Sequence, residues 1–147
     1  MQSIPMRYFS LMLLRVSLAG LLLWWGLAKA FGTGVGQKVS DTYYHGYFSI
    51  ELLLVVFGWV QVVAAVCLAI GLFRLPFLVF QLLVNLFVAV TIWQSIADPF
   101  WMWMPGEKPE TLNALFYPSA IVVAGCFLLL TMRGWDRWAL DRMFSDT

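Results

Sequence analysis

The chain has 147 residues, of which 62% are hydrophobic and only 12% are charged, and its mean hydropathy is +0.83. A soluble domain is about half apolar and about a quarter charged, so this composition excludes an ordinary water-soluble domain and indicates one membrane domain over residues 1–147. The net charge of +1 and the lack of any run of Lys or Arg exclude nucleic acid as a partner.

Four apolar segments follow one another along the chain, at about 11–31, 52–73, 75–97 and 112–132, each of 21 to 23 residues. At ~1.5 Å per residue, a helix of this length crosses the ~30 Å hydrocarbon layer of a bilayer. The segments lack the polar alternation of barrel strands, so helices are expected. The sequence therefore predicts an all-α membrane protein, a bundle of four transmembrane helices.

The first segment has a second interpretation, as a secretory signal, because Ala28-Lys29-Ala30 has the small-x-small pattern of a cleavage site. Arg15 interrupts the early part of the apolar run, which is unusual for such a signal. We therefore expect 11–31 to be a retained helix.

The positively charged residues are divided unequally between the two sides of the predicted membrane. Six arginines fall at the ends of the segments that share the side of Arg74, whereas Lys29, Lys38 and Lys108 fall on the opposite side. Positive residues concentrate in the cytoplasm, so the sequence predicts a multi-pass protein of the cell's inner (plasma) membrane with both termini cytoplasmic. The tail at about 133–144 alternates aromatic and charged residues, which predicts a short interfacial helix.

Polar side chains inside the apolar segments are the candidate site, because such groups are costly in hydrocarbon. They are Arg15, Lys29, Gln61, Gln81 and Asn85, with Gln61 and Asn85 expected to meet near the bilayer midplane. One interpretation is a path or pocket for a proton or a quinone headgroup, in which a cation stabilises a developing anion. The other is interhelical packing, with each polar contact contributing about 0.6 to 2 kcal/mol.

Lys29 and Glu51 both fall at the outer edge of the bundle, so we expect them to form a structural ion pair. Cys67 and Cys126 lie at similar depth; a redox dithiol is geometrically possible there, but packing between helices explains them more simply. His45 is the single histidine, which excludes a bis-His haem within the chain. We expect no metal site and no catalytic residue.

Three stretches together resemble the DoxX family of four-helix membrane proteins. The first helix of that family is similar to LRVSLAG at 14–20 and WGLAK at 25–29. Its second helix is similar to GWVQ at 58–61 and AIGLFR at 69–74, and the ending after its fourth helix is similar to GWDRWALD at 134–141. The resemblance covers most of residues 11–141 and implies the same four-helix layout.

The family is linked to membrane redox systems, including the membrane subunit of an archaeal thiosulfate:quinone oxidoreductase and partners of oxidative-stress enzymes. The resemblance thus implies a link to a quinone-linked membrane redox complex. Because the sequence offers no haem ligands, flavin motif or metal cluster, we expect an accessory membrane subunit of such a complex, without a redox centre of its own and without enzymatic activity on its own. The alternative is a non-redox scaffold, assembly or chaperone partner. We expect no covalently bound cofactor, a quinone or lipid as ligand, and a membrane protein or a second copy as partner within the bilayer.

Overall fold

The structure is a computed structural model. It describes residues 4–32, 34, 37–38, 40–41, 46, 50–98, 103 and 118–145. The regular elements in these residues are all helical, which confirms the predicted all-α class.

Three helices are long and apolar enough to cross a membrane: α1 (Ile4–Phe31), α3 (Glu51–Ile70) and α4 (Arg74–Thr91). The fourth apolar helix, α6 (Pro118–Thr131), has 14 described residues and covers only ~21 Å at ~1.5 Å per residue. The predicted extension over 112–117 lies outside the described residues. Three spanning helices and a shorter apolar one are therefore what the structure shows.

The helix boundaries correct the sequence prediction in three places. α1 begins at Ile4 instead of residue 11. α3 ends at Ile70 instead of residue 73, because Gly71 takes a left-handed conformation (φ 79°) and its N–H bonds to the carbonyl of Leu68. The predicted segment 75–97 is broken at Ile92, which leaves helical geometry and separates α4 from the short α5 (Trp93–Ala97). A three-residue turn thus joins α3 to α4.

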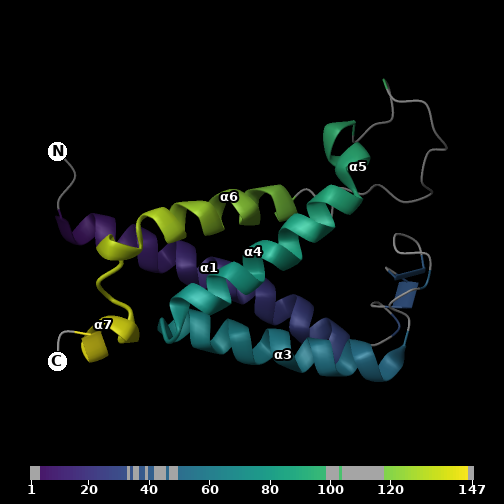
Figure 1. The fold of residues 1–147 in the computed structure, drawn as a ribbon, viewed down its shortest axis with the longest axis horizontal. Coiled ribbons are helices and arrows are strands. Elements are labelled where there is room, and N and C mark those ends of the chain that lie inside the picture. Colours follow the sequence, from purple (N-terminus) through teal and green to yellow (C-terminus); the bar gives the residue numbers. More distant parts are fainter. Residues whose placement is uncertain are drawn as a thin grey trace.

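The helices α1 and α3 run antiparallel and side by side, with α4 crossing them and α6 lying next to α4 (Figure 1). The first pair approaches closely at two glycines. A Cβ on Gly26 would lie 2.9 Å from the carbonyl oxygen of Gly58, and a Cβ on Gly58 would lie 2.7 Å from the backbone nitrogen of Ala30. Small residues at helix crossings allow such backbone contact in membranes.

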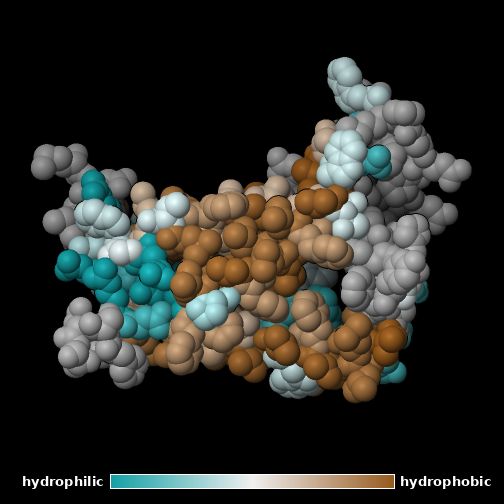
Figure 2. Space-filling model, viewed as in Figure 1, coloured by the Kyte–Doolittle hydropathy of each residue, from teal (hydrophilic) through white to brown (hydrophobic). Residues whose placement is uncertain are grey.

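Two clusters of buried apolar residues form the core between these helices. The larger one comprises Leu11, Leu18, Ala19, Leu68, Leu78, Val122, Cys126 and Leu129, and the smaller one Leu22, Ala64 and Ala65. Nearly all other apolar side chains of the long helices are exposed or partly exposed and form a broad apolar belt, with hydrophilic residues gathered at one end (Figure 2). This distribution is expected of helices that face lipid.

The helix predicted at 133–144 is shorter than expected. This segment forms a 3-10 turn, η2 (Arg133–Trp135), then irregular backbone, then the short helix α7 (Leu140–Ser145). It folds back on the bundle because Asp136 and Ala139 are buried there, and the N–H of Asp141 donates to the carbonyl of Gly71 at 3.0 Å. The beginning of α1, the α3–α4 turn and α7 consequently share one end of the molecule (Figure 1).

Candidate functional site

Two buried arginines meet one buried aspartate at this end of the bundle. Asp136 Oδ2 lies 3.1 Å from Nε of Arg15 on α1 and 3.2 Å from Nη1 of Arg74 on α4. Arg15 also donates to the carbonyls of Leu68 (3.3 Å) and Trp138 (3.1 Å). One carboxylate therefore holds α1, α4 and the C-terminal segment together, and the Arg15 side chain joins α3 to them.

Asp141 is the second acid of this cluster, and it caps the start of α4. Its two carboxylate oxygens accept hydrogen bonds from the backbone N–H groups of Phe73 (2.7 Å) and Arg74 (2.9 Å), and Arg74 Nε lies 3.1 Å away. Burial raises the pKa of this carboxyl, but these hydrogen bonds and the charge of Arg74 outweigh it, so the pKa lies below its ordinary value. Asp141 thus supplies the cap that α4 otherwise lacks.

Gly71 is required by the same cluster. Its φ of 79° is unfavourable for any residue with a Cβ, and a Cβ there would collide with Nη1 of Arg15 and lie 2.6 Å from Cβ of Ala139. Because Gly71 has no Cβ, the α3–α4 turn and the C-terminal segment can both pack against Arg15.

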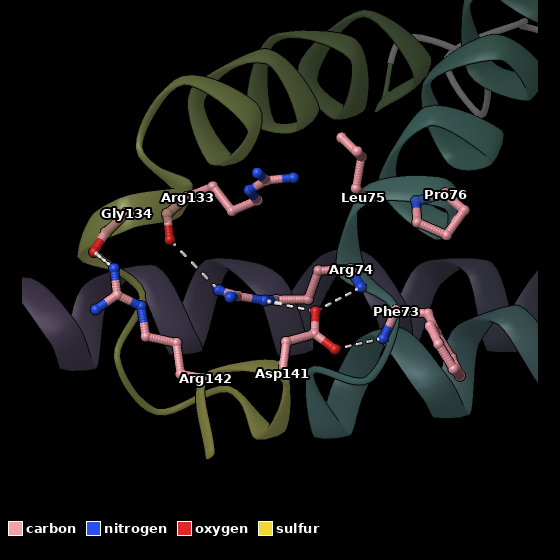
Figure 3. Close-up of a pocket in the computed structure, with 8 residues that line it drawn as sticks. All are labelled: Phe73, Arg74, Leu75, Pro76, Arg133, Gly134, Asp141 and Arg142. Carbon is pink, nitrogen blue, oxygen red and sulfur yellow. Dashed lines mark hydrogen bonds and ion pairs between the residues drawn. The ribbon is translucent and has the colours of Figure 1, made fainter. Parts of the chain in front are cut away.

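A pocket of about 590 Å³ opens beside this network, between the start of α4, η2 and α7 (Figure 3). Its lining residues are Phe73, Arg74, Leu75, Pro76, Arg133, Gly134, Asp141 and Arg142. Arg142 donates to the carbonyl of Gly134, and the Arg133 side chain extends across the pocket toward Leu75. Three arginines and one aspartate make the pocket basic.

Lys29 forms a second polar contact, toward the other end of α1. Its Nζ donates to Oε1 of Gln61 on α3 at 3.0 Å and to the carbonyl of Trp25 at 3.4 Å. The ammonium also lies 5.4 Å from the ring centroid of Trp25 and 5.8 Å from that of Phe57. A cation inside a spanning helix is thus surrounded by aromatic rings and a neutral amide.

The predicted ion pair of Lys29 with Glu51 is corrected by this geometry. No ion pair joins the two in the part of the chain that the structure describes, and Glu51 is exposed at the start of α3. Gln61 is fully buried and closer to the ammonium, because the glycine crossing brings α1 and α3 together at this level.

The remaining amides do not meet as predicted. Gln81 Nε2 donates to the carbonyl of Leu18 on α1 at 2.8 Å, while its Oε1 is buried with no hydrogen-bond partner among the described residues. Asn85 donates to the carbonyl of Gln81 on its own helix at 2.9 Å, and no bond joins it to Gln61 within the described chain. The five candidate residues therefore separate into three groups instead of one continuous polar path.

Cys67 and Cys126 are free thiols, the first partly exposed and the second buried in the core. Cys126 belongs to the larger apolar cluster, as the packing interpretation expects. His45 lies outside the described residues.

The sequence interpretation missed the importance of Arg74, Asp136, Asp141 and Gly71. One signal could have indicated them. The predicted topology already placed Arg15, Arg74 and the tail with its two acids at the same end of the bundle, and buried arginines need carboxylate partners.

Comparisons of the chain with protein-family models, with curated proteins and with solved structures find no match.

Proposed function

We propose that the chain is an accessory membrane subunit of a redox complex, linked to a quinone through Lys29 and Gln61 and without a redox centre of its own. The observation that carries this proposal is the surroundings of Lys29. Its ammonium lies in a spanning helix and, among the described residues, bonds only to an amide and a backbone carbonyl, with no acid to balance its charge. Ionisable residues placed so are functional candidates by default.

The groups around Lys29 fit a flat ring that carries carbonyl oxygens. Two of the three ammonium hydrogens are directed to Gln61 and Trp25, which leaves one for a ligand. The faces of Trp25 and Phe57 offer apolar contact beside it. A bound quinone would supply electron-accepting chemistry, and the fixed charge of Lys29 would favour negative charge on the nearer oxygen.

The second candidate function is a non-redox scaffold or assembly partner. It is favoured by the ion pairs and hydrogen bonds that the other charged residues make. Arg15, Arg74, Asp136 and Asp141 bond to one another and to the backbone, which holds the C-terminal segment in place. A protein in which the buried charges serve structure alone would need no ligand at Lys29.

We further propose a four-helix layout with both termini on the cytoplasmic side of the inner (plasma) membrane. The support is that the beginning of α1 and α7 lie at the same, arginine-rich end of the molecule. Single-cysteine variants in a Cys67→Ala, Cys126→Ala background test this. Lys38→Cys should react with an impermeant probe only from outside the cell, and Thr147→Cys only from inside; labelling of both from one side would contradict the layout.

Purification of the tagged chain from its native membrane separates the two candidate functions. A redox accessory subunit should bring down a stoichiometric partner that carries the visible chromophore, and the isolated chain should show no haem or flavin absorbance. A chromophore that stays with the isolated chain contradicts the absence of a redox centre. A stoichiometric partner with neither chromophore nor quinone supports the scaffold instead.

A further inference from the structure

The pocket beside α4 is lined by three arginines and one aspartate. Arg74 and Asp141 are joined at 3.1 Å. Within the described chain, the Arg133 guanidinium makes no hydrogen bond or ion pair, although its backbone carbonyl accepts from Arg74.

The pocket has a volume of about 590 Å³. The Arg133 side chain extends across it toward Leu75, and Arg142 lies at its edge (Figure 3). A planar guanidinium offers paired N–H donors that match phosphate oxygens.

The backbone of α4 contributes little to anion binding here. Asp141 already occupies the N–H groups of Phe73 and Arg74, and Pro76 has none. An anion in the pocket would therefore be held mainly by the side chains of Arg133 and Arg142.

Exposed apolar side chains adjoin the charged residues of the pocket. Phe73 and Leu75 belong to its lining and are 62% and 48% exposed, and Met132 precedes Arg133 with 45% exposed. Positive charge directly beside exposed apolar side chains fits an amphiphile better than a soluble anion, because acyl chains can run along the belt while the headgroup stays in the pocket.

We propose that this pocket binds the phosphate of an anionic phospholipid, with Arg133 and Arg142 as the principal ligands. Basic pockets next to membrane helices recognise such headgroups, and each basic residue contributes enough to change affinity about fivefold. This inference goes beyond the proposed function and requires neither a quinone nor a partner subunit.

Binding can be measured by calorimetry on the full chain in an uncharged detergent. The probes are dioctanoylphosphatidylglycerol, dioctanoylphosphatidylcholine and inorganic phosphate. The phosphatidylglycerol should bind one to one and more tightly than the other two. The double variant Arg133→Gln, Arg142→Gln should bind it about 25-fold more weakly, from about fivefold per arginine. Arg7→Gln removes an exposed charge on the first turns of α1 and should leave the affinity unchanged.

A second variant provides an independent test in case the double variant does not fold. Leu75→Glu keeps every arginine contact, places a carboxylate facing Arg133, and should also weaken phosphatidylglycerol binding. Unchanged affinity in both variants would overturn the proposal, as would equal affinity for phosphatidylcholine. If inorganic phosphate binds as tightly as the lipid and is lost in the same variants, the pocket is a phosphate site and the lipid assignment is wrong.

Discussion

Asp136→Asn tests the buried network most severely, because one carboxylate balances two arginines. The substitution keeps the shape of the side chain but removes its charge. Arg15 Nε and Arg74 Nη1, at 3.1 and 3.2 Å from Oδ2, would then face a neutral amide in a buried site. Arg74 retains Asp141, whereas Arg15 retains only the carbonyls of Leu68 and Trp138. The variant therefore leaves a buried charge without compensation.

Breaking a buried ion pair by removing one partner costs about 3–5 kcal/mol of unfolding free energy. We expect Asp136→Asn to fall in this range. Arg15→Met combined with Asp136→Asn removes one charge of each sign and leaves the pair of Arg74 with Asp141. The double variant should therefore be more stable than the sum of the two single effects, by about 1–3 kcal/mol, as for directly contacting residues.

The free energy of unfolding can be measured in mixed detergent by circular dichroism, with Glu51→Gln as the control. This control makes the same acid-to-amide change at an exposed residue that forms no ion pair in the described chain, and it should shift stability by no more than about 0.5 kcal/mol. The reasoning is refuted if Asp136→Asn costs no more than the control, or if the effects of Arg15→Met and Asp136→Asn simply add.

Three further outcomes follow from the same contacts and can be measured with the same unfolding assay. Gly71→Ala should cost more than 2 kcal/mol, since φ is 79° and the space is filled, whereas Gly20→Ala, where a Cβ meets nothing within 4 Å, should be neutral or stabilising by up to ~1 kcal/mol; equal effects would contradict the turn geometry. The lowered pKa of Asp141 adds stability that is fully present above about pH 4 and is lost as the pH falls through the folded-state value, so Asp141→Asn should flatten the acid limb of the curve, and parallel curves would argue against it. Lys29→Met and Gln61→Leu should show a coupling of about 0.6 to 2 kcal/mol in a double-mutant cycle, and a coupling near zero would mean that their 3.0 Å contact does not form.

Hydropathy and length were sufficient to predict the helical class and, for three of the four predicted segments, a helix long and apolar enough to cross a membrane, because the cost of unsatisfied backbone in lipid leaves few alternatives. The boundaries were less predictable. A hydropathy profile continues through Gly71 to Phe73, and only the left-handed conformation of the glycine ends α3 at Ile70. The break at Ile92 has no such signal, since no glycine stands beside it and the next proline, Pro99, is seven residues further on.

The C-terminal segment could not be placed by its pattern alone. Alternating Trp and charged residues fit an interfacial helix, yet Asp136 is buried and bonds to helices more than sixty residues away in sequence. Pairing of that kind depends on which ends of the helices meet, which is a tertiary property. The same limit explains why Lys29 was assigned to Glu51. Both residues were expected at the same edge of the bundle, but which side chain of α3 reaches the ammonium depends on the glycine crossing.

Quinone retained by the isolated chain tests the central claim most directly. The chain would be purified in mild detergent, incubated with ubiquinone or menaquinone, washed, extracted and quantified, with Asn85→Leu as a control because Asn85 bonds only within its own helix in the described structure. The account predicts about one quinone per chain in the wild type and in Asn85→Leu, with most of it lost in Lys29→Met and in Gln61→Leu. Retention that is equal in all four proteins, or absent from the wild type, would contradict the assignment of a quinone to Lys29 and Gln61.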